Sequence, residues 1–233
     1  AISTSGPGAT NMMTGIADAY FDSIPVLYIT GQVNSYEYKY DKPIRQQGFQ
    51  ETDIISIVKP VTKYASLVDK IENLRYELEK AVYIATTGRK GPVVLDLPMD
   101  IQRQEINPEE LFAFIPPKEE CHTIDLDRIL PIINKSERPM LLIGGGCQDK
   151  KTKELLSKFL TNTQMPVITS LMGRGVVNET YSNYLGMVGS YGNRSANMAI
   201  SNADLLIVLG SRLDTRQTGA KIESFLPDST IIH

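Results

Sequence analysis

The 233 residues combine 42% hydrophobic with 22% charged side chains, the balance of a globular protein with enough chain for two domains. The 24 basic and 27 acidic residues are scattered and give a formal net charge of −3, so nothing predicts nucleic acid or an anionic membrane as a partner. The longest apolar runs are strand-sized, far short of the roughly 20 residues of a membrane helix, and exclude a membrane span.

Two cysteines, Cys121 and Cys147, stand far apart, so neither a disulfide framework nor a thiolate zinc site is expected. No basic-then-apolar leader opens the chain, and we therefore expect a cytoplasmic protein. The sequence starts without Met and ends abruptly at Ile231-Ile232-His233, which suggests a piece of a longer polypeptide.

In the first half of the chain, short β-branched runs alternate with segments of helical period, which predicts a parallel α/β architecture. The stretch 34–54 is polar, aromatic and irregular, and loops of that length are usually functional. The apolar run 92–98 is typical of a strand buried on both faces. In chain order we expect a helix at 10–20, a strand at 26–30, a helix at 70–86 ended by Gly88, and a strand at 92–98.

A Pro-rich, charged stretch without a strong period, at about 102–122, is the best linker in the chain. After it the α/β alternation restarts, so we expect a second α/β domain. Its predicted elements are a helix at 126–134, a strand at 140–143, a helix at 151–160 and strands at 167–168, 205–209 and 230–232.

Side chains for independent catalysis are scarce. The two histidines, His122 and His233, lie in the linker and at the last position, and no Gly-x-Ser-x-Gly elbow is present. If the protein is an enzyme, a cofactor performs the difficult step.

Three segments lie at the carboxyl ends of expected strands, where glycines let ligands approach the backbone of a parallel sheet. The first, Thr4–Asn11, lacks the Lys and the spacing of a P-loop, and a structural turn explains it as well as a site does. The second, Gly144-Gly145-Gly146, runs toward a helix near Asp149 and suits a phosphate, or equally a tight turn.

The third segment is Gly210–Arg216, directly after an apolar strand. Arg212 and Arg216 are four residues apart, so one helical turn would place both guanidinium groups on one face, where they could grip an anion. The alternative is an exposed Arg-Asp-Arg cluster.

Together these segments resemble the acetohydroxyacid synthase (acetolactate synthase) large subunit and related thiamine-diphosphate enzymes, over nearly the whole chain. Each motif is weak alone, but their order and spacing are specific. The motifs are Ser5-Gly6-Pro7-Gly8-Ala9-Thr10-Asn11, Thr30-Gly31-Gln32-Val33, Gly48-Phe49-Gln50-Glu51, Thr87–Val93 leading into Asp96-Leu97-Pro98, and Gly210–Arg216.

The resemblance implies two α/β domains with parallel sheets flanked by helices. Residues 1–103 would be the C-terminal part of a pyrimidine-binding domain, 104–122 a linker, and 123–233 a Rossmann-like central domain of the FAD type, truncated at its C-terminal end. The implied complete protein is a homodimer or homotetramer, because the family forms its active site between subunits, and the sequence leaves a regulatory subunit open.

The resemblance also assigns site residues. Pro7 and Asn11 would lie near the aminopyrimidine ring of thiamine diphosphate, and Phe49 and Gln50 would project into the reaction site. The residues that match the positions holding FAD, in a structural and non-redox role, are Arg89, Gly144, Gly145, Gly146, Ser170, Leu171, Gly210, Arg212, Asp214 and Arg216.

The implied reaction is decarboxylation of a 2-keto acid, pyruvate, and addition of the resulting enamine to a second carbonyl, a step of branched-chain amino acid biosynthesis. The family's catalytic Glu would lie upstream of Ala1, and the segment binding Mg²⁺ and the diphosphate downstream of His233. No metal ligand is therefore expected within the chain, and we do not expect it to turn over substrate alone.

The sequence departs from the family at three places. Met99 replaces a usual Lys, the excursion at 34–48 is longer, and Ser190-Tyr191 stands where Met-His is common. Met99 favours the alternative of a 2-keto acid decarboxylase or another carboligase of the superfamily, and the Ser190-Tyr191 pair leaves FAD binding open. A non-catalytic nucleotide-binding or oligomer-forming module is the second alternative. A nicotinamide oxidoreductase is disfavoured, since no Gly-x-Gly-x-x-Gly unit with a following acidic residue occurs.

Overall fold

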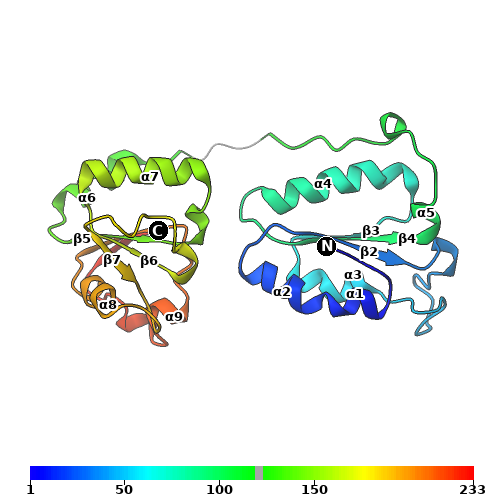
Figure 1. Ribbon diagram of the computed structural model, residues 1–233, viewed down its shortest axis with the longest axis horizontal. Coiled ribbons are helices and arrows are strands. Elements are labelled where there is room, and N and C mark those ends of the chain that lie inside the picture. Colours follow the sequence, from blue (N-terminus) through cyan, green and yellow to red (C-terminus); the bar gives the residue numbers. More distant parts are fainter. Residues whose placement is uncertain (119–122) are drawn as a thin grey trace. The chain divides into compact units, whose positions relative to one another are not determined.

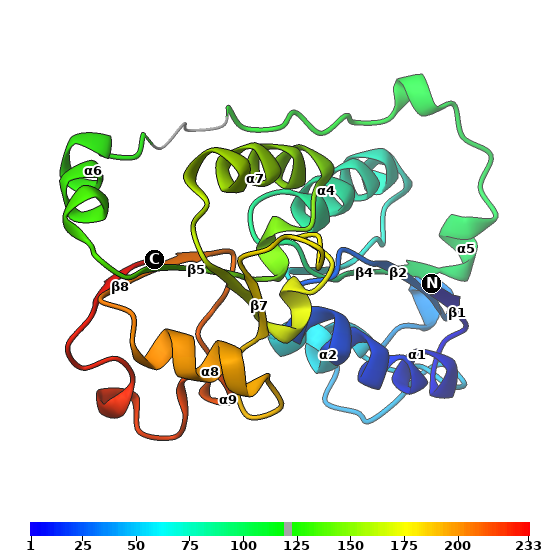
Figure 2. The ribbon, with the colours of Figure 1, turned by 60° about the vertical axis from the view of Figure 1, so that its left-hand side comes forward.

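The computed structural model describes residues 1–118 and 123–233, which form two compact units, one on each side of the gap. Both units are α/β structures in which helices flank a parallel sheet, as the sequence predicts (Figures 1 and 2). The end of the expected linker, with Cys121 and His122, lies outside the described residues.

The N-terminal unit is built on a four-stranded parallel sheet with strand order β1-β2-β4-β3. Its strands are β1 (Ile2–Ser3), β2 (Leu27–Gln32), β3 (Tyr64–Leu67) and β4 (Val93–Pro98). Its helices are α1 (Pro7–Asn11), α2 (Met13–Phe21), α3 (Ile54–Val58), α4 (Leu74–Thr86) and α5 (Met99–Gln102). Short 3-10 turns at Ser35–Glu37, Lys59–Val61, Ile71–Asn73 and Pro108–Glu110 complete the unit.

Strand β4 lies inside this sheet and is covered on both faces (Figure 1). Helix α4 packs on one face, where Ala81 and Ala85 contact the cluster around Leu95. Helices α1, α2 and α3 cover the other face, where Ile16 and Ile54 join Val94. This double cover explains the continuous apolar run from which the strand was predicted.

The central unit has a five-stranded parallel sheet with order β7-β6-β5-β8-β9. Its strands are β5 (Pro139–Ile143), β6 (Val167–Thr169), β7 (Tyr184–Met187), β8 (Leu205–Leu209) and β9 (Thr230–Ile232). Its helices are α6 (Leu126–Lys135), α7 (Lys150–Thr163), α8 (Arg194–Ser201) and α9 (Thr215–Thr218). Three 3-10 turns cover Gly145–Cys147, Leu171–Gly173 and Ile222–Ser224. The chain leaves β5 toward β6 and β7 and returns to β8, so the direction of winding switches between β5 and β8.

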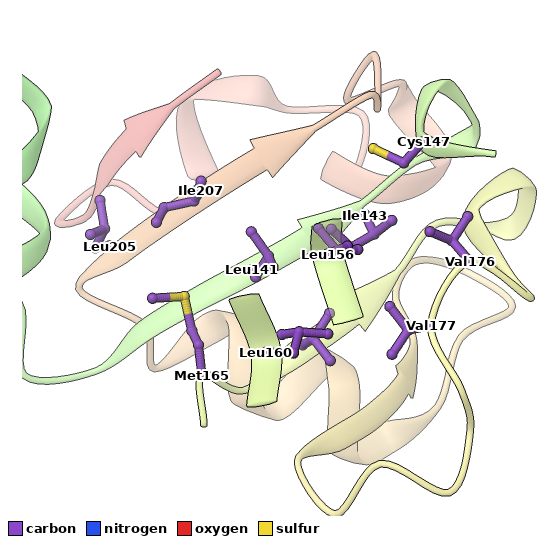
Figure 3. Packing of buried hydrophobic residues seen from close by; sticks show 11 residues of the cluster. Leu141, Ile143, Cys147, Leu156, Leu160, Met165, Val176, Val177, Leu205 and Ile207 are labelled. Carbon is purple, nitrogen blue, oxygen red and sulfur yellow. The ribbon is translucent and has the colours of Figure 1, made fainter. Parts of the chain in front are cut away.

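Two apolar clusters sandwich the central sheet. Helix α7 sends Leu156 and Leu160 toward Leu141 and Ile143 of β5, as Figure 3 shows. On the opposite face, α8 contributes Ala196 and Ile200 to a second cluster. Successive residues of β5 and β8 contact the two clusters in turn, so both faces of these strands are apolar. This is why β5 and β8 were recognisable as buried strands.

The sequence missed β3 and β7, which both lie at sheet edges. Their residues are only half-buried and include Ser66 and Gly186, so neither a continuous apolar run nor a clean alternation marks them. The helix expected at 10–20 is instead the pair α1 and α2, and the short α3 and α8 were not predicted. No helix in the described ranges has both the length and the apolar character needed to cross a membrane.

The carboxyl ends of β5 and β8 touch through glycines. A Cβ atom on Gly144 would lie 2.1 Å from the carbonyl oxygen of Gly210, and one on Gly146 would lie 2.8 Å from the Cα of Gly210. The Gly144 N–H donates to the Leu209 carbonyl at 2.8 Å, and the Gly146 N–H donates to the Gly210 carbonyl at 2.9 Å. The backbone after β5 therefore packs directly against the backbone after β8, at the point where the winding of the sheet switches.

We expect Gly144→Ala to lower the free energy of unfolding of the central unit by about 1–3 kcal/mol or more, because the methyl group has only backbone to displace. Native-state hydrogen exchange of the β5 and β8 amides measures this in the central unit alone. Gly145→Ala is the control, since its Cβ would meet the Cβ of the half-exposed Met172 at 3.0 Å, and it should cost less. Equal protection in the two variants would contradict the crowding at Gly144.

Candidate active site

The glycine loop of the N-terminal unit follows β1 and leads into α1 at the carboxyl edge of the sheet. Gly6 is buried and has a φ of 62°, and a Cβ there would lie 2.7 Å from the Gln50 carbonyl oxygen and 2.9 Å from the Gln50 Cβ. Pro7 begins α1 and Asn11 ends it, and both are exposed. The structure thus packs the first glycine loop against the segment that holds Phe49 and Gln50.

Phe49 and Gln50 form the tip of a turn. The Glu51 N–H donates to the Gly48 carbonyl at 3.2 Å and closes this turn. Phe49 is 87% exposed, and Gln50 has a φ of 60°, in the left-handed region that non-glycine residues rarely adopt. Backbone strain of this kind persists only where surrounding contacts fix it, and it gathers at functional sites.

A buried polar network lies beneath this turn, where β2 and β4 end. Thr30 and Asp96 are register partners, and the Thr30 hydroxyl donates to Asp96 Oδ1 at 2.6 Å. The Gln32 Nε2 donates both to Asp96 Oδ2 and to the Thr52 carbonyl, each at 2.8 Å. Burial raises the pKa of Asp96 to about 6, although the hydrogen bonds from Thr30 and Gln32 oppose the shift.

Two departures from the family pattern lie close together in this structure. Met99 is 36% exposed and opens α5 directly after β4. The next residue, Asp100, accepts hydrogen bonds from the Ser35 N–H at 2.8 Å and the Ser35 hydroxyl at 2.6 Å. The long excursion is therefore attached at its start to the helix that carries Met99.

Arg89 lies elsewhere in the N-terminal unit. It precedes β4, at the amino edge of the sheet, and its Nε donates to the Ser23 hydroxyl at 2.9 Å. The contact of Gly6 with Gln50 is at the opposite, carboxyl edge. Within this unit, Arg89 is thus apart from the other predicted residues.

The predicted residues of the central unit follow three adjacent strands. Gly144-Gly145-Gly146 follow β5, Gly210 follows β8, and Ser170 and Leu171 follow β6. Ser170 is buried, and its hydroxyl accepts a hydrogen bond from the Gly173 N–H at 3.1 Å, whereas Leu171 is 64% exposed. They gather at the carboxyl edge, at the switch in winding where α/β sheets bind ligands.

The helical turn expected to align Arg212 with Arg216 is wrong. Leu213 has a φ of 51°, and α9 begins only at Thr215, capped by Asp214, whose Oδ1 accepts from the Arg216 N–H at 3.0 Å. The Arg212 Nε lies 3.5 Å from Asp214 Oδ2. A left-handed residue between the two arginines breaks the i, i+4 relation, so their spacing does not place them on one helical face.

Arg216 contacts the segment that carries the third departure. One of its terminal guanidinium nitrogens, Nη1, donates to the Tyr191 hydroxyl at 2.8 Å, and the guanidinium carbon lies 5.3 Å from the centre of the Tyr191 ring. The Ser190 N–H donates to the Arg216 carbonyl at 2.9 Å. The sequence indicated that Ser190-Tyr191 was unusual, but it gave no sign that this pair contacts Arg216.

The chemistry of the central edge fits an anion with a flat ring only in part. The exposed arginines Arg212 and Arg216 can pair with phosphate, and exposed Leu171 and Tyr191 offer apolar surface. The N–H groups of Gly144 and Gly146 already donate to carbonyls of the β8 end, so these two amides do not form a phosphate cradle. The arginines, rather than these glycine amides, are the groups that suit an anionic cofactor.

Two further features of the described residues concern metal ions and cavities. Within residues 1–118 and 123–233, no group of three or more His, Cys, Asp or Glu side chains is placed to hold a metal ion. A cavity of about 230 Å³ lies between α7 and the segment 176–181. None of the predicted site residues lines it. Its lining residues are Leu156, Ser157, Leu160, Thr161, Val176, Val177, Asn178, Thr180 and Tyr181.

Comparison with known protein families gives two matches. Residues 1–57 match the N-terminal TPP binding domain of the thiamine pyrophosphate enzymes, and residues 126–233 match the central domain of the same enzymes. The chain belongs to the thiamine pyrophosphate enzyme family. Thiamine pyrophosphate is another name for thiamine diphosphate, so the matches confirm the family resemblance on which the predicted sites depend.

Curated members of this family are similar over the full chain. The acetolactate synthase isozyme 2 large subunit of Escherichia coli is 39% identical over 232 residues, which cover 100% of this chain and 41% of the relative. A probable acetolactate synthase large subunit of Methanocaldococcus jannaschii is 41% identical, over 100% of this chain and 39% of the relative. The chloroplastic acetolactate synthase of Arabidopsis thaliana is 39% identical, over 100% of this chain and 34% of the relative. The chain thus spans about two fifths of the length of such thiamine pyrophosphate enzymes.

Sequence reasoning missed the polar residues that support the site. Glu51 belongs to a motif that was recognised, and Gln32 and Asp96 belong to two others, yet none was assigned a function. A buried carboxylate looks like an exposed one in sequence, because its burial depends on strands brought together by the fold. For Asp96 the available signal was its place in the run 92–98, which was predicted to be a strand buried on both faces. For Gln32 it was the position just after another predicted strand of this thiamine pyrophosphate enzyme.

The pKa of Asp96 predicts a pH-dependent stability. A carboxyl whose folded pKa, about 6, exceeds its unfolded value stabilises the fold fully below about pH 4, and that contribution is lost as the pH rises through about 6. The loss is on the order of 3 kcal/mol. Asp96→Asn should remove this pH dependence, as measured by urea unfolding between pH 4 and pH 7.

Asp204 supplies a control of opposite sign. Hydrogen bonds from Ser136, Glu137 and Arg138 lower its pKa to about 2, so its titration affects stability only as the pH falls below about 4. Asp204→Asn should leave the slope between pH 4 and pH 7 intact. An unchanged slope in Asp96→Asn would contradict the raised pKa of Asp96.

Proposed function

We propose that this chain is part of a thiamine-diphosphate-dependent carboligase of the acetolactate synthase kind. Its reaction is decarboxylation of a 2-keto acid, pyruvate, and joining of the remaining two-carbon unit to a second carbonyl. The observation that carries the proposal is the contact between Gly6 and Gln50 at the carboxyl edge of a parallel sheet. This contact places the loop that would face the thiamine ring beside the turn that would face the substrate.

Each residue of this edge has a role in the proposal. Bound thiamine diphosphate supplies an electron sink for decarboxylation, which no side chain provides. Pro7 and Asn11 border its aminopyrimidine ring with exposed, uncharged side chains, which suit a heterocycle better than a phosphate. Phe49 covers the reacting carbons and excludes water, and the Gln50 amide orients the carbonyl of the substrate. Magnesium and the diphosphate are held by segments outside these residues.

In the central unit we propose an FAD site with a structural role. Arg212 and Arg216 pair with its phosphates, and exposed Leu171 and Tyr191 contact a ring. Asp214 orients Arg212, from which it lies 3.5 Å. Gly144, Gly145, Gly146, Gly210 and Ser170 shape the edge on which FAD rests.

A second candidate, a 2-keto acid decarboxylase or a carboligase with another acceptor, is favoured by Met99. This thioether stands where a Lys is usual, and through Asp100 its helix is tied to the long excursion. A neutral side chain there weakens the hold on a second, anionic keto acid. The proposed complete protein is a cytoplasmic homodimer or homotetramer that a regulatory subunit can join.

The proposal is tested by incubating the complete polypeptide that contains this chain with thiamine diphosphate, magnesium and pyruvate, with and without FAD. Acetolactate is the expected product. Acetaldehyde as the main product would favour the decarboxylase, because release of the two-carbon unit replaces its transfer. No consumption of pyruvate or of other 2-keto acids in either mixture would contradict both candidates.

The proposed FAD site predicts the effect of a single substitution. Arg212→Ala should weaken FAD binding by roughly 1.5–3 kcal/mol, the contribution of a hydrogen bond to a charged group. Titration followed by flavin fluorescence measures the affinity. Arg128→Ala, on the exposed face of α6, is the matched control and should bind FAD like the wild type. Equal affinities in all three proteins would contradict the role of Arg212.

A further inference from the structure

The irregular segment 34–54, which carries Phe49 and Gln50, folds around a single carboxylate. Glu51 is 6% exposed, and its two oxygens accept three backbone hydrogen bonds. The Lys39 N–H donates to Oε1 at 2.8 Å, while the N–H groups of Gln47 and Gly48 donate to Oε2 at 2.7 Å and 3.0 Å. A charged acceptor buried among three amides binds them more strongly than a neutral one would.

These hydrogen bonds reach across the whole middle of the excursion. They join its first part, at Lys39, to the residues that precede the turn, Gln47 and Gly48, and so close a loop around Glu51. Gly48 is also the residue whose carbonyl accepts from the Glu51 N–H. The carboxylate and the backbone of one residue therefore hold both sides of the turn at Phe49 and Gln50.

A second tether holds the residue after Glu51. The Gln32 Nε2 donates to the Thr52 carbonyl, and the same nitrogen donates to buried Asp96. The Gln32 Oε1 accepts from the Val33 N–H at 3.0 Å, which fixes the orientation of the amide. The turn is thus fixed to the end of the sheet on its C-terminal side, while Glu51 fixes it to its own loop.

We propose that Glu51 is a positioning residue that holds Gln50 in its left-handed conformation against Gly6. This inference rests on the proposed function for its catalytic consequence, but not for its structural one. The Gln50 backbone conformation is costly and needs contacts that impose it. Without the carboxylate, Lys39, Gln47 and Gly48 lose their acceptor, and the turn relaxes away from the loop that precedes α1.

Hydrogen exchange of the 233-residue chain tests the tether without any cofactor. Glu51→Ala should speed exchange of the Lys39, Gln47 and Gly48 amides, and of the amide at position 51, by roughly tenfold or more. Glu51→Gln keeps one oxygen, so part of the protection should return. Glu37→Gln is the matched control, because Glu37 accepts from the Asn34 N–H and side chain in the same excursion without contacting the turn. Unchanged exchange in Glu51→Ala would overturn the proposal.

Kinetics of the complete polypeptide test the consequence for the reaction. Glu51→Ala should lower kcat roughly tenfold or more, since a small displacement of a positioned group costs rate, while KM and the affinity for thiamine diphosphate change by less than about threefold. Glu51→Gln should retain more of the wild-type kcat than Glu51→Ala does. The control Glu37→Gln should have the kcat of the wild type. Faster exchange with an unchanged kcat would limit Glu51 to folding the loop and overturn its positioning role. A wild type that consumes no 2-keto acid would refute the proposed function, and the exchange result would still decide whether Glu51 holds the turn.

Discussion

Both sheets of this chain are parallel, and their carboxyl ends are closed by main chain that crosses main chain at glycines. Gly6 meets Gln50 in the N-terminal unit, and Gly144 meets Gly210 in the central unit, at distances that leave no room for a Cβ. Each crossing brings together segments separated by tens of residues in sequence. Apart from Arg89, which precedes β4 at the amino edge, the predicted site residues lie on loops at these carboxyl edges.

The crossings change how the glycine motifs are interpreted. A glycine that follows a strand is commonly taken as an opening for a ligand, but at Gly144 and Gly146 the space is filled by the chain itself. The amides of these residues are likewise used inside the fold. The N–H groups of Gly144 and Gly146 therefore bind the β8 end, and these glycines set how closely the β5 and β8 ends approach.

The sequence predicted the parallel α/β class and the buried strands because apolar runs such as 93–95 and 205–208 need no tertiary information to be recognised. It failed at β3 and β7, whose edge positions leave only half of each residue covered. For the sites, motif order identified the loop at Gly6 and the turn at Gln50. It did not reveal that Leu213 adopts a left-handed conformation, which separates Arg212 from Arg216, or that Asp96 accepts hydrogen bonds from Thr30 and Gln32. Such features depend on long-range packing, and residue spacing carries no record of it.

Two carboxylates, Asp100 and Glu51, anchor the irregular segment 34–54. Asp100 binds Ser35 at its start, and Glu51 binds Lys39, Gln47 and Gly48 toward its end. Both anchors are carboxylates that accept backbone amides, and Asp100 also accepts from the Ser35 hydroxyl. Residues 40–46 lie between the anchored positions, and Gln46 among them also contacts the turn, because its Nε2 donates to the Glu51 carbonyl at 3.3 Å. The segment is therefore held at both sides by carboxylates, at its start beside the helix that Met99 opens and at its end beside the turn of Phe49 and Gln50.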